Sequence, residues 1–222
     1  MLAPTATRPT ADPDFQTLQT ACRQLGLELT QSQYDSLVRY THLLRDWNTR
    51  VNLVSRHDID RVMSYHVVDS LAVQRLIPRD ARVCDIGTGA GLPGIPLVLV
   101  RPDIEMLLVE SSQKRSRFLD AAKAELGLSR VTVLAERAEL LAPLGCDVVL
   151  SRLSGPVTDV VKHSAPHRKP AGTIVLYKTR GAAAELARAA KLLARKRLRV
   201  VAAHDILLPL SSVPRRFIVL GS

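Results

Sequence analysis

Three alternating glycines stand between Asp85 and Gly94, in the run Asp-Ile-Gly-Thr-Gly-Ala-Gly-Leu-Pro-Gly. Glycine has no Cβ, so the backbone of such a run can turn sharply and approach a ligand closely. Pro93 suits the first turn of a helix, whose N-terminal amides would point back toward a ligand above the strand ends. The run is therefore typical of a nucleotide-type cofactor site, and a tight turn without a ligand is the structural alternative.

The spacing of these glycines favours one class of cofactor. Dinucleotide sites use GxGxxG and place a pyrophosphate on the helix N-terminus, whereas Gly87, Gly89 and Gly91 follow GxGxG. Asp85, at the end of a predicted strand, suits the positively charged amino group of a methionine moiety and would repel a pyrophosphate. Glu110, at the end of the next strand, suits ribose hydroxyls in either class. The sequence therefore predicts S-adenosylmethionine and disfavours a nicotinamide-dependent dehydrogenase.

The elements that must position this loop fall into two regions. Up to Leu76 the pattern is helical, with helices predicted at about 14–26 and 60–76 and a third one beginning after a capping box at Thr30 and Gln33. The third helix has one apolar face, formed by Leu37, Tyr40, Leu44 and Trp47.

After Pro78, short apolar runs alternate with helical stretches. Strands are predicted at 82–86, 104–110, 131–134, 147–150, 173–177, 198–202 and 217–220, and helices at about 93–100, 112–126, 155–166 and 181–196. This alternation predicts a mostly parallel sheet covered on both faces. The final connection, 207–214, is too short for a parallel crossover, so the last strand should be antiparallel. The predicted fold is α/β, with seven strands and an N-terminal helical extension, a layout that resembles the Rossmann-like methyltransferase fold.

This pattern also predicts the organisation of the chain. We expect a disordered leader over 1–13, a helical region over 14–78 packed on the core, and a cofactor-binding domain over 79–222. No apolar run approaches the ~20 residues of a membrane span, and the first residues lack the pattern of a secretory signal. The three cysteines form no CxxC pair, which argues against a disulfide framework and a zinc site. A cytoplasmic protein without metal or membrane partner is expected.

The charge of the chain favours a polyanionic partner. The formal net charge is +10, and part of the excess is concentrated in residues 191–199. An arginine-rich but merely solvated surface is the alternative. We expect the RNA-facing surface to combine Arg45, Arg50 and Arg56 with the 191–199 segment.

Several segments resemble the bacterial small-subunit ribosomal RNA guanine-N7 methyltransferases, also called the glucose-inhibited division protein B family. They are residues 47–48, 51–55, 66–73, 85–97, 114–119, 125–128, 137–139 and 151–152, within a resemblance that covers about 30–180. The resemblance implies that Gly87 and Leu92 contact S-adenosylmethionine and that Ala138 and Glu139 lie beside the adenine. It also implies a site arginine at Arg152. The chain departs from the family pattern at 153–156 and 177–181.

The resemblance further implies that the methyl acceptor is guanine N7 in 16S ribosomal RNA, either as free RNA or in the small ribosomal subunit. The residues after Arg152 are unlike the Pro-Pro-aromatic signature of enzymes that methylate exocyclic amines. Because N7 has a lone pair and no proton, no general base is required. Arg152 is the one catalytic candidate, expected to position the guanine or a phosphate. An ion pair of Arg152 with Asp147 or Asp159 is the structural alternative.

Other expectations concern the residues before the sheet and the rival functions. His66 and Asp69 either line the same cleft as Arg152 or pin the N-terminal helices onto the core. Met63 and Tyr65 are expected to serve helix packing, and the chain is expected to act as a monomer. A small-molecule methyltransferase on the same fold and a non-enzymatic RNA-binding assembly factor remain alternative functions.

Overall fold

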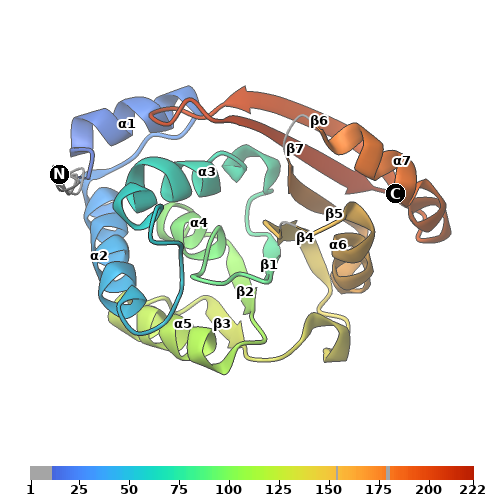
Figure 1. Ribbon diagram of the computed structural model, residues 1–222, viewed down its shortest axis with the longest axis horizontal. Helices are drawn as coiled ribbons and strands as arrows, with labels where there is room; N and C mark the ends of the chain where they lie inside the picture. The colour runs from blue at the N-terminus through green and yellow to red at the C-terminus, as the bar shows by residue number, and fades with distance from the viewer. Residues whose placement is uncertain (1–11, 154, 179–180) are drawn as a thin grey trace, which may run out of the picture.

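A seven-stranded sheet forms the centre of the computed structural model, which describes residues 12–153, 155–178 and 181–222 (Figure 1). The strands are β1 (Arg82–Ile86), β2 (Glu105–Val109), β3 (Val131–Leu134), β4 (Cys146–Ser151), β5 (Arg168–Lys178), β6 (Arg199–Leu207) and β7 (Pro214–Gly221). Their spatial order is β3-β2-β1-β4-β5-β7-β6. Strands β1 to β5 are parallel, and β7 is antiparallel to both β5 and β6. The predicted fold class and the antiparallel last strand are confirmed.

Strand β7 lies between β5 and β6, not at the edge of the sheet. The chain crosses from β5 through a helix to β6, one position further out, and β7 returns into the space between them. The first residues of β7 therefore lie beside the last residues of β5, with Arg216 opposite Lys178. This is the carboxyl edge of the parallel strands, where open α/β sheets bind their ligands.

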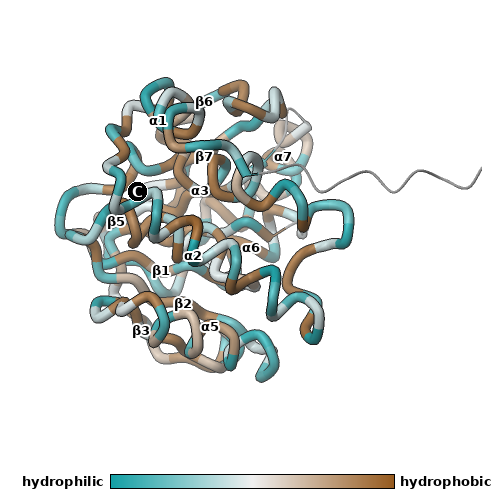
Figure 2. The backbone as a smooth tube through the Cα atoms, turned by 90° about the vertical axis from the view of Figure 1, so that its left-hand side faces the viewer, coloured by the Kyte–Doolittle hydropathy of each residue, from teal (hydrophilic) through white to brown (hydrophobic). Residues whose placement is uncertain are grey.

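Alternate side chains of the strands point to opposite faces, and each face has its own apolar core. Helices α1 (Phe15–Gln24), α2 (Gln31–Asn48), α3 (Val68–Leu71), α4 (Gly94–Val100) and α5 (Gln113–Glu125) pack on one face. Helices α6 (Val157–Ser164) and α7 (Ala182–Arg195) pack on the other. In Figure 2 much of the inner chain has the colour of apolar residues, while the outer loops are largely hydrophilic. The prediction of a sheet covered on both faces is confirmed.

The capping box of α2 is present, because the Gln33 amide donates to Thr30 Oγ1 (3.3 Å) and the Thr30 amide donates to Gln33 Oε1 (2.9 Å). Leu37, Tyr40 and Leu44 on its apolar face are fully buried. The Tyr40 hydroxyl donates to the carbonyl of Ala90 (2.7 Å) in the glycine run. Helix α2 thus holds the loop from one side.

The prediction of one continuous helix over 60–76 is wrong. The segment forms a 3-10 turn η1 (Ile59–Arg61), a π-helix η2 (Val62–Val67), helix α3 and a second 3-10 turn η3 (Gln74–Leu76). Two more 3-10 turns lie further on, η4 (Ala138–Leu140) and η5 (Ala165–His167). A π turn is compatible with the same apolar spacing as an α-helix, so the sequence pattern does not distinguish them. Such turns often occur at functional sites, and η2 contains Tyr65 and His66.

The N-terminal residues that the structure describes make contacts with α2. Asp12 Oδ1 lies 2.6 Å from Arg45 Nη2, and the Pro13 carbonyl accepts from the Tyr34 hydroxyl (3.1 Å). The rest of the predicted leader, residues 1–11, is outside the described residues. The N-terminal helices share one core with α4 and α5, and the division into domains at residue 78 stays a prediction. None of the helices in the described ranges is long and apolar enough to cross a membrane.

Candidate functional site

The glycine run connects β1 to α4 at the carboxyl edge of the sheet. Gly87, Gly89 and Gly91 have φ values of 68°, 60° and 81°, which favour glycine. A Cβ at Gly87 would lie 2.6 Å from Leu153 Cδ2, and one at Gly91 would lie 2.4 Å from Ile95 Cδ1. A Cβ at Gly89 would meet no described atom within 4 Å. Gly87 and Gly91 therefore permit close packing inside the protein, whereas the backbone of Gly89 faces open space.

Asp85 lies beneath this loop, with no exposed surface. Its Oδ2 accepts hydrogen bonds from Thr88 Oγ1 (2.6 Å) and from the amide of Gly94 (3.0 Å). Its Oδ1 is buried and accepts from no donor among the described residues. Burial raises the pKa of Asp85 to about 6, against the lowering effect of the Thr88 and Gly94 bonds. A buried carboxyl with one unpaired oxygen fits the ammonium group predicted for this place.

Glu110 follows β2 and supports the glycine loop from the other side. Its Oε2 accepts from the amide of Gly89 (3.0 Å) and its Oε1 from the amide of Ser112 (2.8 Å). Only 5% of the residue is exposed. The Glu110 carboxylate therefore fixes the backbone at Gly89, the glycine of the run that faces open space. Each carboxylate oxygen keeps a second lone pair for a further donor.

Two cavities flank Gly87. The loop cavity, of about 200 Å³, is lined by Leu53, Val54, Ser55, Asp58, His66, Gly87, Thr88, Gly89, Ala90, Leu92 and Arg152. The Glu139 cavity, of about 260 Å³, is lined by Ile86, Gly87, Val109, Ser111, Glu136, Arg137, Ala138, Glu139, Leu153 and His163. The fold thus brings Gly87, Gly89, Leu92, Ala138, Glu139 and Arg152 to one row of cavities. Asp85, Gly91 and Glu110 are not among the lining residues and lie behind the loop.

The Glu139 cavity has an ordered polar wall. The carbonyl of Ala138 lies 3.0 Å from His167 Nε2, which fixes the turn η4. The Glu139 carboxylate lies 3.5 Å from Arg137 Nη1 and 3.3 Å from His163 Nδ1. Its own backbone amide lowers the pKa of Glu139 most, and His163 and Arg137 lower it further. Glu139 is therefore an ionised acceptor at the mouth of the cavity.

Arg152, just after β4, reaches back to the segment before the sheet. Its Nη1 lies 3.2 Å from Asp69 Oδ2, and its Nη2 lies 3.0 Å from His66 Nδ1. The alternative partners are both engaged elsewhere, Asp147 with Lys169 (2.9 Å) and Asp159 with Lys162 (3.1 Å). His66 and Asp69 thus lie in the cleft with Arg152, and the same contacts join the segment before the sheet to β4.

His66 is neutral in this arrangement. Burial and the charge of Arg152 lower the pKa of His66 to about 4. A neutral ring that accepts from Arg152 at Nδ1 carries its proton on Nε2. The Nε2 atom lies 3.8 Å from Asp58 Oδ2. His66 therefore adds no charge beside Arg152. Among the described residues, Asp69 is the only carboxylate within 4 Å of the Arg152 guanidinium.

Two residues of the cleft are missed by the sequence analysis. Arg215, at the start of β7, donates from Nε to Asp69 Oδ1 (2.8 Å) and from Nη2 to the Tyr65 hydroxyl (2.8 Å). Tyr65, expected to serve helix packing, therefore also accepts a hydrogen bond from a strand of the sheet, while its ring packs 4.5 Å from Arg61 Cζ. Met63, in contrast, is fully buried as expected. Arg215 could not be found from local spacing, since it is 146 residues from Asp69.

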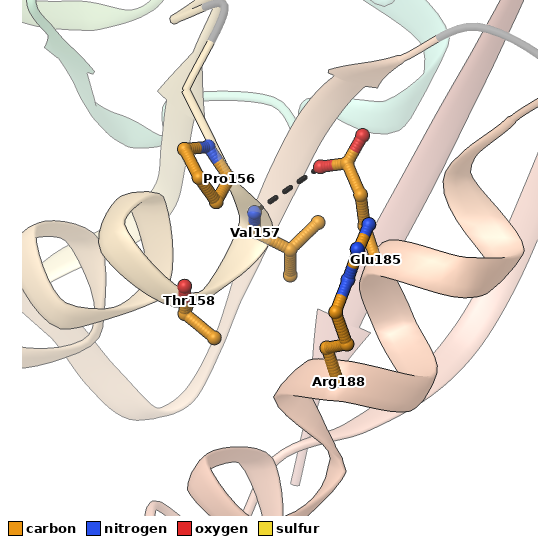
Figure 3. A pocket seen from close by; sticks show the side chains of 5 residues that line it. All are labelled: Pro156, Val157, Thr158, Glu185 and Arg188. Atoms are coloured by element: carbon orange, nitrogen blue, oxygen red, sulfur yellow. Dashed lines mark hydrogen bonds between the residues drawn. The ribbon is translucent and has the colours of Figure 1, made fainter.

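Two further cavities continue the row beyond Arg152. The Arg215 cavity, of about 350 Å³, is lined by Tyr65, Asp69, Arg152, Leu153, Tyr177, Lys178, Glu185 and Arg215. The α6–α7 cavity, of about 530 Å³, lies between Pro156, Val157 and Thr158 on one side and Glu185 and Arg188 on the other (Figure 3). The Val157 amide donates to Glu185 Oε2 (3.2 Å). The shared residues Arg152 and Glu185 join these cavities to the loop cavity.

The structure does not bring the expected basic surface together. Residues 53–55 and Asp58 line the loop cavity, so the loop with Arg56 is at the carboxyl edge. Arg199 pairs with Gly221 at the far end of β7, at the opposite edge of the sheet. Arg45 forms an ion pair with Asp12. The 191–199 segment therefore forms a second, separate basic region.

A sheet of this strand order, with a glycine loop after β1 and a row of cavities at its carboxyl edge, defines the S-adenosylmethionine-dependent methyltransferase fold. Among solved structures, M. jannaschii TYW2 in complex with AdoMet has a similar fold, with a TM-score of 0.56 and 12% identity over 78% of this chain and 77% of that chain. Residues 33–209 match the family model "GidB: rRNA small subunit methyltransferase G", and the chain belongs to this family.

Two relatives support the assignment to this family. The ribosomal RNA small subunit methyltransferase G of Nitrosococcus oceani is 39% identical over 157 residues, which cover 70% of this chain and 73% of the relative. The protein of the same name from Chlorobaculum tepidum is 40% identical over 167 residues, which cover 74% and 77%.

Proposed function

We propose that this protein transfers a methyl group from S-adenosylmethionine to guanine N7 in 16S ribosomal RNA of the small ribosomal subunit, in the cytoplasm. The observation that carries the proposal is the position of Arg152, which lines both the loop cavity and the Arg215 cavity. One guanidinium thus stands between a glycine loop suited to the cofactor and a basic cavity suited to RNA. Family membership supports the same substrate.

The residues around the glycine loop fit the cofactor. The unpaired, buried Oδ1 of Asp85 suits the ammonium group, and the open backbone of Gly89 leaves room for a ligand. Leu92 and Gly87 would line the methionine side in the loop cavity. Ala138 and Glu139 would lie beside the adenine in the second cavity. Gly91 would act through its packing on Ile95, which shapes the loop.

Glu110 is proposed to accept from the ribose hydroxyls while it holds the Gly89 amide. The bound cofactor supplies a sulfonium methyl group that is already activated toward a nucleophile. Guanine N7 offers a lone pair and carries no proton, so the protein has no proton to remove. The contribution of the protein is then alignment of the guanine, and effective molarity provides much of the rate.

Arg152 is proposed to align the guanine or a neighbouring phosphate. Asp69 and His66 hold two of its terminal nitrogens, which fixes the plane of the guanidinium. A planar, oriented guanidinium can donate two parallel hydrogen bonds to phosphate oxygens, or a hydrogen bond to guanine O6 that leaves the N7 lone pair free. The neutral state of His66 leaves this positive charge available for an electron-rich partner.

The test is methyl transfer to small ribosomal subunits from cells that lack the protein. With labelled S-adenosylmethionine, we expect one methyl group per subunit, recovered as N7-methylguanine in 16S RNA. Subunits from cells that contain the protein are the control, because their site is already methylated. Transfer to a small molecule only, or cofactor binding without transfer to either substrate, would contradict the proposal.

A further inference from the structure

The Arg215 cavity lies on the side of Arg152 away from the glycine run. None of the described residues of that run lines it, and its lining includes three cationic side chains, Arg152, Lys178 and Arg215. Because Arg152 stands between this cavity and the glycine run, a ligand bound here would belong to the RNA acceptor, and the inference rests on the proposed function.

Arg215 is the most firmly held of the three cations. Its Nε and Nη2 donate to the two oxygens of Asp69 (2.8 and 3.0 Å), and Nη2 also donates to the Tyr65 hydroxyl (2.8 Å). The Arg215 side chain is 13% exposed and that of Asp69 is 1% exposed. The remaining terminal nitrogen, Nη1, donates to none of the described residues, so it is available to a ligand in the cavity.

The charges of the cavity do not balance. Lys178 is neutralised locally, because its Nζ lies 2.9 Å from Glu185 Oε2 and donates to the carbonyl of Gly155 (2.8 Å). Asp69 supplies one negative charge, which Arg152 and Arg215 share. Among the residues that line the cavity, one positive charge is left over in a largely buried place. A charge held out of water requires an anionic partner or a persistent cost in free energy.

We propose that the Arg215 cavity binds a phosphodiester group of the RNA strand next to the target guanine, and that Arg215 is the side chain that binds this phosphate. Asp69 and Tyr65 hold the guanidinium so that Nη1 is presented to the phosphate. A phosphate supplies the missing negative charge, whereas the edge of a base is neutral. Phosphate contacts fix the register of a nucleic acid on a protein, and base contacts provide specificity. The contact would thus place the guanine beside Arg152.

This residue lies beyond the part of the chain that matches the family model, which ends at residue 209. It comes from β7, whose insertion between β5 and β6 brings its first residues to the carboxyl edge. The last hairpin of the chain therefore contributes a substrate contact as well as sheet stability.

The test compares Arg215→Gln, Arg215→Lys and Arg216→Gln, with subunits from cells lacking the protein as substrate. Arg216 is a matched control, because it is the next residue of β7, points to the opposite face and pairs with Asp205 (2.7 Å) outside the cavity. For Arg215→Gln we expect KM for subunits to rise about tenfold, and the slope of log affinity against log salt to become shallower by about 0.7, as for one lost phosphate contact. The affinity for S-adenosylmethionine should stay within twofold of wild type.

Arg215→Lys should keep the salt slope of the wild type, because it keeps the charge, and Arg216→Gln should keep both slope and KM. An unchanged slope for a folded Arg215→Gln protein would overturn the proposal and leave Arg215 as internal support for Asp69. A lower melting temperature with weaker cofactor binding and an unchanged slope would overturn it in the same way. If the wild-type protein does not methylate subunits, the proposed function itself fails, which is a separate outcome.

Discussion

Asp69 and Arg152 are 83 residues apart in the chain and form an ion pair of 3.2 Å between Oδ2 and Nη1 at the carboxyl edge of the sheet. The pair joins the helical segment before the sheet to the end of β4. Asp69 is also bound by Arg215 from β7, so that three distant parts of the chain meet at one carboxylate. This relationship makes the effect of changes at Arg152 predictable.

Arg152→Ala is expected to lower the rate of methyl transfer to subunits by about 100-fold, which corresponds to the loss of a charged contact in the transition state. Stability should change little, because Asp69 keeps its ion pair with Arg215. Arg82→Ala is a matched control, since Arg82 pairs with Glu105 (2.7 Å) at the first residue of β1, away from the carboxyl edge. Single-turnover transfer of labelled methyl groups measures the effect. A wild-type rate for Arg152→Ala would exclude a positioning role.

Gly89→Ala and Gly127→Ala should separate cofactor binding from backbone strain. Both glycines have positive φ (60° and 64°), and a Cβ at either would meet no described atom within 4 Å. Both changes should therefore cost about 1 kcal/mol of stability. Only Gly89→Ala places a methyl group over the loop, so it alone should raise the Kd for S-adenosylmethionine, by tenfold or more in calorimetric titration. Equal cofactor affinities would show that Gly89 does not face the ligand.

Cofactor binding should depend on the ionisation of Asp85. Its pKa is raised to about 6, so the carboxyl is ionised above that pH and neutral below it. A neutral carboxyl no longer attracts an ammonium group, and the Kd for S-adenosylmethionine should rise as the pH falls below about 6. Asp85→Asn should bind weakly at every pH. It should be at least as stable as wild type at pH 7.5, because burial disfavours the charged form it replaces. A pH-dependent Kd in Asp85→Asn would assign the titration to another group.

The periodicity of the sequence predicts the central sheet well, for a physical reason. Strands such as β1 and β2 are buried on both faces, so they consist of continuous apolar runs that end where the chain reaches solvent. β5 is longer than predicted, because it begins at Arg168, which pairs with Cys146, and residues 169–172 bulge out of the ladder before it resumes at Thr173. The exposed bulge carries no apolar signal, so the sequence pattern does not reveal it.

The candidate site, like the sheet, has one part that the sequence predicts and another part that it does not. The glycine loop could be predicted, because its function depends on neighbouring residues in one turn. The family segment at 47–55 also has a local cause, since Asn48 Oδ1 accepts from the amides of Leu53 and Val54 (2.8 and 3.0 Å) and so shapes one wall of the loop cavity. The contacts of Asp69 with Arg152 and Arg215 could not be predicted, because they depend on which strands become neighbours.

Stability should respond to pH through His66. Its pKa is lowered to about 4 from an ordinary value of 6.5, so the native state resists protonation. Between these values the unfolded chain binds more protons than the native protein, and stability is lost as pH falls from about 6.5 toward 4, by up to about 3 kcal/mol. The difference in unfolding free energy between wild type and His66→Gln should shrink over this range.

The two basic regions should contribute unequally to RNA methylation. Arg199 and Leu207 are at opposite ends of β6, a strand of nine residues, which places them roughly 25–30 Å apart. Charges at the Arg199 end are screened from the carboxyl edge, since the Debye length at physiological salt is about 8 Å. The triple reversal Lys196→Glu, Arg197→Glu and Arg199→Glu is therefore expected to change kcat/KM for subunits by less than about threefold. The single change Arg215→Gln should lower it about tenfold. A larger effect of the triple reversal would mean that the RNA also contacts the amino edge of the sheet.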